Sequence, residues 1–241
     1  MRILKSKVKN SSITIAITAY NEEENLEWVV KNTLKSLPKY FNSFEVVIVD
    51  DGSTDSTGKI ADRLAKKNKN IRVIHQLNGG YSKAMLSGIK AAKKDFVAYM
   101  PSDGQFLVDD MRNCFKIIEE NDLVLGFRGG RPDYSFYRLI LSYGYLLMLL
   151  LLFGINYQDV GWVNIWKTKK VQKLKLNGVG GIFILTEIVV KFKRAGYKIT
   201  EARSYYHPRK SGEVKNAKFK VVRDTFINAW KLWWDLKMGK V

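Results

Sequence analysis

The sequence predicts an α/β fold with a mostly parallel central sheet flanked by helices. In the first half of the chain, short apolar runs rich in β-branched residues alternate with amphipathic stretches. The apolar runs are almost continuously hydrophobic, as is typical of strands covered on both faces. Acidic residues follow three of these runs, and ligands bind at the carboxyl ends of the strands in such sheets. A ligand site is therefore expected at that edge.

The expected elements alternate regularly along the chain. Strands are expected at 13–18, 44–50, 71–75 and 95–100, and helices at 22–37, 54–67 and about 82–93. The first helix is predicted from apolar residues at helical spacing, namely Leu26, Val29, Val30, Leu34 and Leu37. This order places Glu22, Asp50, Asp51 and Asp103 just after strands.

The chain is strongly basic, with 41 Lys and Arg against 23 Asp and Glu and a formal net charge of +18. Such a charge attracts nucleic acid, anionic lipid or phosphorylated ligands without choosing among them, and a solvated lysine-rich surface also explains it. A single cysteine, Cys114, cannot form an internal disulfide and fits a reducing compartment. The charged N-terminal stretch lacks an apolar run, so no secretory signal is expected.

An uncharged apolar run covers residues 139–158. Its length would allow it to cross a bilayer. A crossing would separate the basic segment 207–215 from the carboxylates beside which its cations are expected to act. We therefore expect helices that lie at the membrane interface or pack in the core.

The segment 216–240 has the pattern of an amphipathic interfacial helix. Aromatic and aliphatic residues recur at steps of three and four, three Trp fall within five residues, and Lys and Arg fill much of the remainder. An ordinary helix that packs its apolar face on the domain is the alternative. The expected domain organisation is a catalytic domain over 1–217, which includes 139–158, and a membrane-associated helix over 218–241.

Two motifs in the first half carry groups suited to a nucleotide. In "AYNEEENL" (19–26), a base can stack on Tyr20 and Glu22 can accept hydrogen bonds, although acids are also favoured at helix N-termini. In "VDDGSTDST" (49–57), two acids end a strand, Gly52 permits a tight turn, and Ser53 or Thr54 is expected to cap the next helix. The turn and cap alone leave the paired acids unexplained. The Gly-rich stretch at 78–80 either admits a phosphate or sugar or simply makes a turn.

The motif "MPSDGQ" (100–105) holds one acid, Asp103, after a buried strand. These motifs, in this order, resemble the inverting family-two glycosyltransferases of the GT-A fold, and within them the polyprenyl-phosphate group that includes dolichol-phosphate mannose synthase. The resemblance covers about residues 12–217. Pro101 stands where that family has the first acid of its Asp-x-Asp motif, so a divalent metal, Mg²⁺ or Mn²⁺, is expected to be held more weakly than by two acids.

The resemblance implies roles for particular residues. Donor binding falls to Thr18, Tyr20, Glu22, Val49, Asp51, Ser102, Asp103, Arg128, Arg209 and Lys215. Thr18 stands where the family usually has proline, so a backbone contact is expected there. Asp103 and Gln105 are the expected metal ligands, and Asp103, Asp159 and Arg209 the catalytic residues. In "RKSGEVK" (209–215), Arg209 and Lys215 are expected to clamp phosphates.

The function that the resemblance implies is inverting transfer of a hexose, mannose or glucose, from a GDP- or UDP-linked sugar to a polyprenyl or dolichyl phosphate. The protein is expected on the cytoplasmic face of the membrane, peripheral or monotopic, against anionic lipid and without a nucleic-acid partner. One alternative is the same fold acting on a polysaccharide or glycolipid hydroxyl. Others are a nucleotidyltransferase and a basic nucleic-acid or lipid-binding module without catalysis, which explains the charge but not the acids at three strand ends.

Overall fold

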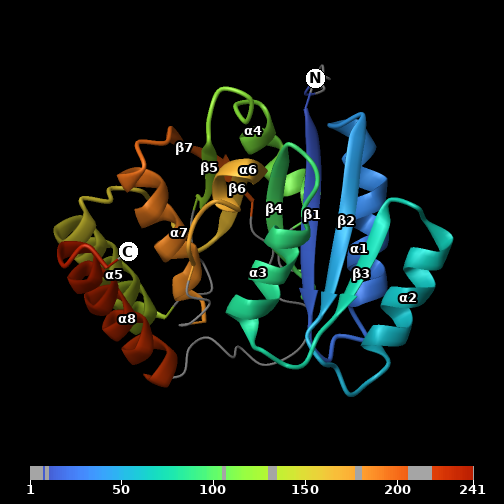
Figure 1. Ribbon diagram of the computed structural model, residues 1–241, viewed down its shortest axis with the longest axis horizontal. Coiled ribbons are helices and arrows are strands. Elements are labelled where there is room, and N and C mark those ends of the chain that lie inside the picture. Colours follow the sequence, from blue (N-terminus) through green and yellow to red (C-terminus); the bar gives the residue numbers. More distant parts are fainter. Residues whose placement is uncertain are drawn as a thin grey trace.

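The computed structural model describes residues 8, 11–104, 107–129, 135–176, 181–205 and 219–240. Within these residues, seven strands form one sheet in the order β3-β2-β1-β4-β6-β5-β7 (Figure 1). The strands are β1 Ser12–Ala19, β2 Ser43–Asp50, β3 Ile71–His75, β4 Phe96–Pro101, β5 Leu123–Arg128, β6 Val163–Lys167 and β7 Ile199–Ser204. The helices are α1 Leu26–Ser36, α2 Thr57–Lys67, α3 Tyr81–Ala91, α4 Arg112–Phe115, α5 Phe136–Phe153, α6 Thr168–Val171, α7 Phe183–Arg194 and α8 Phe219–Lys237.

The sheet is parallel except at β6. β1 pairs in parallel with β2 and β4, β2 with β3, and β5 with β7, whereas β6 runs antiparallel to both β4 and β5. The carboxyl ends of the six parallel strands described therefore share one edge with the start of β6. This arrangement confirms the predicted mostly parallel α/β sheet flanked by helices.

Alternate side chains along the strands supply two apolar layers. On one face Ile13, Ile15 and Ile17 of β1 join a core cluster that also holds buried residues of α1, α2 and α4. On the other face Ala16 joins a cluster built with α3, α5, α7 and α8. The two layers cover both faces of the sheet, which explains why its strands read as continuous apolar runs.

Two helices begin later than the sequence predicts. α1 begins at Leu26 rather than near residue 22, and α2 begins at Thr57 rather than residue 54. The expected capping of α2 by Ser53 or Thr54 is wrong, because the Ser53 hydroxyl and the Thr54 backbone N–H bond to Asn21 instead. Asp55 takes over at the helix start, where its carboxylate accepts the backbone N–H of Thr57 at 2.9 Å.

α5 and α8 pack together beside α7 (Figure 1). Tyr145 and Phe226 join them, with ring centroids 6.1 Å apart. α8 buries Ala229, Leu232 and Leu236 in the core cluster that it shares with α5 and α7. Its contact with the domain therefore matches the core-packing alternative on one face, while its other face remains open.

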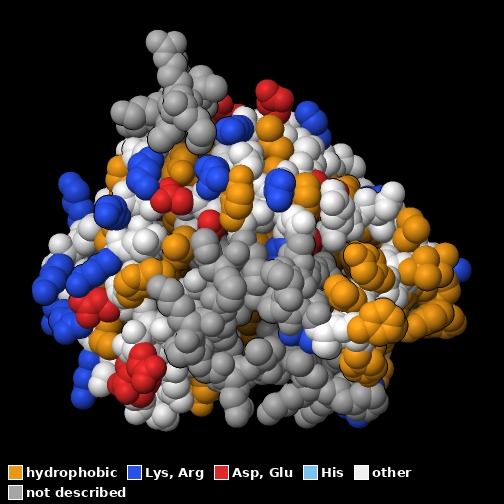
Figure 2. Space-filling view, turned by 180° about the vertical axis from the view of Figure 1, so that it is seen from behind, with side chains coloured by type: hydrophobic (Ala, Val, Ile, Leu, Met, Phe, Trp, Pro, Cys, Tyr) orange, Lys and Arg blue, Asp and Glu red, His pale blue; other side chains and the backbone are white. Residues whose placement is uncertain are grey.

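Large apolar side chains remain exposed on both helices. On α5 they are Phe136, Tyr137, Ile140, Tyr143, Leu147, Leu150 and Leu151, and on α8 they are Ile227, Trp230 and Trp234. Figure 2 shows hydrophobic side chains gathered on the side of the molecule that α5 occupies. Among the described helices, α5 is the one whose length and composition would suit a membrane crossing, and 11% of it is buried. Length and composition alone are weak evidence for a crossing.

Candidate functional site

The predicted site residues that the structure describes gather at the carboxyl edge of the sheet. Tyr20 and Glu22 follow β1, Asp51 follows β2, and Ser102 and Asp103 follow β4. Arg128 ends β5, and Asp159 precedes β6, whose antiparallel direction brings its start to the same edge. The antiparallel β6 is thus what brings Asp159 to the site.

Hydrogen bonds join the turn after β1 to the turn after β2. Asn21, with a left-handed φ of 53°, donates its N–H to the Ser53 hydroxyl and accepts the N–H of Thr54 at 2.9 Å. The N–H of Glu22 donates to the Thr57 hydroxyl at 2.9 Å. Polar residues of the two motifs therefore form one rigid rim, because each turn supplies the partners that the other lacks.

The carboxylate of Asp51 organises the Gly-rich turn that opens α3. Its Oδ1 accepts hydrogen bonds from Gln76 Nε2 at 2.6 Å and from the N–H of Gly79 at 2.9 Å, and its Oδ2 accepts the N–H of Gly80 at 2.8 Å. A carboxylate offers about four acceptor positions, so these bonds leave about one for a ligand. The predicted contact of Asp51 with a base stays a prediction.

Gly52 allows this turn to close. Its φ is +74°, and a Cβ there would lie 2.7 Å from the backbone N of Asn78. A side chain at this position would clash with the backbone that leads to α3 and would displace the turn after β2.

Asp50 has a structural partner in His75. Its Oδ2 lies 2.9 Å from His75 Nδ1, while His75 Nε2 lies 3.1 Å from Oδ1 of Asp62 on α2. The hydrogen bond to Asp50, and then that to Asp62, raises the pKa of His75. His75 thus links the end of β2 to α2. Of the two adjacent acids, Asp50 therefore has a structural role in this link.

The remaining residues predicted at the base differ in exposure. Tyr20 is 41% exposed, as a stacking partner needs to be. Glu22 accepts the side-chain amide of Asn25 through Oε2 at 2.9 Å. Val49 is fully buried and packs with Val47 and Ala84, so its predicted contact with the donor concerns its backbone alone.

The loop that carries Asp103 is tied to β1. Pro101 is the register partner of Thr18, and the Ser102 hydroxyl donates to the Thr18 carbonyl at 2.8 Å. The two departures from the family pattern, threonine at 18 and proline at 101, thus lie opposite each other. Gly104 has φ +70°, and a Cβ there would approach the Trp28 ring to 3.0 Å.

Two phenols, that of the buried Tyr99 and that of the partly buried Tyr81, lie near this loop. The Tyr99 hydroxyl lies 3.1 Å from Thr18 Oγ1, and the Tyr81 and Tyr99 rings meet at 5.3 Å. Burial raises the pKa of Tyr99 to about 12 and raises that of Tyr81, and the Asp103 charge adds to both shifts. Both phenols therefore stay protonated and do not compete with Asp103 as anionic ligands.

Arg128 and Asp159 form an ion pair. Arg128 Nε lies 2.7 Å from Asp159 Oδ2, and the two side chains are 12% and 6% exposed. The Arg128 guanidinium also stacks over Trp162, 4.7 Å from the ring centroid. The segment from Asp159 to Trp162 therefore holds Arg128 from two sides.

Residues 14–178 match the family described as Glycosyl transferase family 2. The chain belongs to glycosyltransferase family 2. This membership confirms the resemblance stated from the sequence, together with the expectation of a glycosyltransferase at the level of the family.

The names of two curated relatives of this family 2 chain contain a polyprenyl phosphate. It is 28% identical to dodecaprenyl-phosphate galacturonate synthase of Rhizobium johnstonii, over 90% of this chain and 66% of that protein. It is 30% identical to undecaprenyl-phosphate 4-deoxy-4-formamido-L-arabinose transferase of Proteus mirabilis, over 54% of this chain and 40% of that protein. The family 2 chain thus spans less than two thirds of the length of these relatives.

A solved structure supports the fold of the family 2 chain. Glucosyl-3-phosphoglycerate synthase from Mycobacterium tuberculosis, in complex with Mn²⁺, UDP and phosphoglyceric acid, superposes with a TM-score of 0.71. The similarity covers 93% of this chain and 79% of that one, at 16% identity. At this identity the likeness shows the GT-A fold.

Three predicted residues fall outside the described part of the chain, namely Gln105, Arg209 and Lys215. Among the described residues, no group of three or more His, Cys, Asp or Glu side chains is arranged to hold a metal ion. Within the described part of the family 2 chain, Asp103 is therefore the one predicted metal ligand.

Sequence reasoning missed Glu201, His75 and Trp162. Each acts on a partner that is remote in sequence, or through a ring stack that no local pattern reveals.

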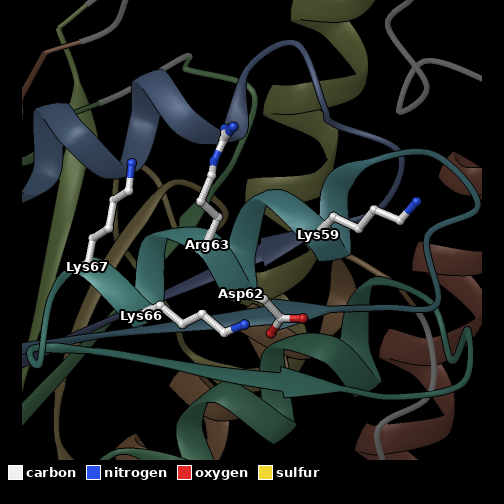
Figure 3. Close-up of a pocket in the computed structure, with 5 residues that line it drawn as sticks. All are labelled: Lys59, Asp62, Arg63, Lys66 and Lys67. Atoms are coloured by element: carbon white, nitrogen blue, oxygen red, sulfur yellow. The ribbon is translucent and has the colours of Figure 1, made fainter.

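A surface depression on α2, lined by Lys59, Asp62, Arg63, Lys66 and Lys67, contains no predicted site residue of the family 2 chain (Figure 3). Its side chains come from one helix, as expected for a solvated basic face.

Proposed function

We propose that the chain transfers a hexose, mannose or glucose, from a nucleoside diphosphate sugar to a polyprenyl phosphate at a membrane surface, with inversion. The observation that carries the proposal is the grouping of Asp103 and the Arg128–Asp159 pair at one sheet edge of a family 2 fold. The names of two relatives supply the acceptor class.

At the donor end, Tyr20 offers a stacking face for the base, and Glu22 and Asp51 offer acceptors to base and ribose. Their turns are bonded to each other, so the donor meets a preorganised rim.

Asp103 suits a divalent cation, Mg²⁺ or Mn²⁺. It is the acid at the end of β4, hard cations prefer oxygen ligands, and the neighbouring phenols stay protonated. When bound, such an ion supplies positive charge beside the departing diphosphate. Gln105 is the second proposed ligand, and the fold neighbour was solved with Mn²⁺ and also with Mg²⁺ and UDP.

At the acceptor end, Asp159 and Arg128 act as a pair. A phosphate acceptor is already anionic near neutral pH, so it attacks the anomeric carbon without a strong base. Asp159 then orients Arg128 and the acceptor, and Arg209 and Lys215 supply further positive charge to the phosphates. With a hydroxyl acceptor, Asp159 becomes the general base instead.

A comparison of acceptors that share one prenyl chain tests the proposal. Labelled nucleotide sugar is supplied with a short prenyl phosphate, with the corresponding prenyl alcohol, and with a glycolipid hydroxyl. We expect label in the prenyl phosphate product alone. Label in the glycolipid alone would contradict the proposal and support the alternative in which the acceptor is a hydroxyl group.

Pro101→Asp is expected to tighten metal binding. The substitution adds a second carboxylate to the loop of Asp103, opposite Thr18 in the register. The metal concentration for half-maximal activity, measured with Mg²⁺ and Mn²⁺, should fall. Pro101→Ala is the matched control, because it also removes the proline ring but adds no carboxylate, and it should leave that concentration unchanged. An unchanged value in Pro101→Asp would mean that Pro101 shapes the loop.

The open faces of α5 and α8 are proposed to lie on anionic membrane, at its cytoplasmic surface. Exposed Trp230 and Trp234 share α8 with Lys231 and Lys237, and Lys237 stacks on Trp233 at 4.2 Å. Aromatic residues with lysines on an amphipathic helix are typical of interfacial binding. A protein bound at the membrane surface would encounter its lipid acceptor by diffusion within that surface.

Trp230→Ser combined with Trp234→Ser should release the protein from anionic vesicles. Burying a large apolar side chain is worth about 1.5–3 kcal/mol, so we expect binding to fall at least about tenfold for each Trp. Substitution suits the test better than deletion of α8, whose Leu232 and Leu236 belong to the core. Trp28→Ser, at an exposed Trp on α1, is the control. Unchanged flotation of the double variant would contradict the proposal.

A further inference from the structure

Glu201 on β7 is a partly buried carboxylate that the proposed mechanism does not use. Its Oε1 accepts the backbone N–H of Gln158 at 2.6 Å. Glu201 is the register partner of Leu125 on β5, three residues before Arg128 (Figure 1). It therefore contacts the site segment from a strand to which no site role has been assigned.

The contacted segment needs such support. α5 ends at Phe153 with Gly154 as its C-cap, and the chain must turn back through residues 155–162 before it enters β6. This stretch has no strand or helix assigned, so its backbone groups need other partners. Within it, Asp159 is only 4% exposed and must meet Arg128 at 2.7 Å.

Electrostatics alone would not place a glutamate here. Burial, and also the charge of Asp159, raise the pKa of Glu201. A second carboxylate beside Asp159 is unfavourable by itself. The backbone N–H of Gln158, which its carboxylate accepts, offsets part of this cost and gives Glu201 a specific contact with the site segment.

We infer that Glu201 is a positioning residue that fixes the Gln158–Asp159 turn from β7, so that the Asp159 carboxylate meets Arg128 at the acceptor end of the site. Arg128 holds the side chain of Asp159, and Glu201 holds the backbone N–H of Gln158, the residue before it. The part that concerns the acceptor rests on the proposed function.

Glu201→Ala and Glu201→Gln test the inference. Alanine removes the hydrogen-bond acceptor, whereas glutamine keeps a carbonyl oxygen at the same reach without the charge. For Glu201→Ala we expect kcat/KM for the prenyl phosphate to fall at least about tenfold, because small misplacements of site groups are costly. The Kd for the nucleoside diphosphate should stay within about twofold, because the hydrogen bond of Glu201 is with Gln158 and not with the turns after β1 and β2 that are proposed to face the base. Glu201→Gln should recover most of the loss.

Glu45→Ala is the matched control. Glu45 is a buried strand glutamate that, like Glu201, accepts a backbone N–H, here from Lys93 at 2.7 Å, but it lies near the start of β2. Its loss should lower the unfolding temperature without a selective change in the KM for the acceptor. If Glu45→Ala and Glu201→Ala changed the acceptor KM equally, Glu201 would only stabilise the fold, and the inference would be wrong.

Amide hydrogen exchange separates the inference from the proposed function. Peptides covering 155–162 should exchange faster in Glu201→Ala and at the wild-type rate in Glu201→Gln, whatever the acceptor is. If the wild-type protein labels no prenyl phosphate, the proposed function fails while this measurement still decides the contact. Unchanged exchange and unchanged acceptor kinetics in folded Glu201→Ala would overturn the inference.

Discussion

Asp103→Ala is expected to abolish transfer while the protein stays folded. Asp103 follows β4 at the site edge and is the acid of the loop that begins at Pro101. Removal of one preorganised charge-stabilising group costs about 100- to 1,000-fold in rate, and loss of the proposed metal ligand should reach at least that scale. Initial rates at saturating donor, with the unfolding temperature measured in parallel, provide the test.

Asp62→Asn is the control for this loss of a carboxylate. Asp62 is exposed on α2, where it pairs with His75, and it belongs to no part of the proposed site. Its rate should match that of the wild type. Full activity in folded Asp103→Ala, with added Mg²⁺ or Mn²⁺ held constant, would remove Asp103 from the mechanism.

Breaking the Arg128–Asp159 pair should reduce both stability and transfer. Both side chains are largely buried, and removal of one partner from a buried pair typically costs about 3–5 kcal/mol, because the other charge remains unpaired. Arg128→Met and Asp159→Asn should therefore each lower the free energy of unfolding. The double variant should regain much of the stability but none of the activity. Denaturant unfolding and initial rates on the same samples measure both.

The pair Lys191–Glu187 on α7 is the matched control. It is equally buried, with side chains 8% and 4% exposed, and it lies within one helix. Lys191→Met should destabilise the protein without a selective loss of activity per folded molecule. If the Arg128–Asp159 double variant transferred sugar at the wild-type rate, the pair would have a structural role only.

The strands of the first half could be predicted from local sequence, because a buried parallel strand is apolar over its whole length. β3, for example, covers the predicted residues 71–75. The reversed direction of β6 could not be predicted, because strand direction depends on which neighbours pair. That reversal decides where Asp159 lies, so its place beside Arg128 required the structure.

The motifs indicated the candidate site, but one structural expectation within them was wrong. Ser53 or Thr54 was expected to cap a helix, and instead both join the turn after β2 to the turn after β1 through Asn21. The partners of Asp51 lie 25 to 29 residues away, and the partner of Glu201 lies 43 residues away. The pattern of a single sequence indicates which residues share a face of one helix or strand. It does not predict contacts between residues so far apart in the chain.

The most direct test of the account is a panel of labelled GDP and UDP sugars, each incubated with a short polyprenyl phosphate and Mg²⁺ or Mn²⁺. The account predicts that a mannose or glucose donor puts label into the lipid with inverted anomeric configuration, and that a chelator or Asp103→Ala removes the label. Absence of labelled lipid with every donor, from folded protein that binds prenyl phosphate vesicles, would contradict it.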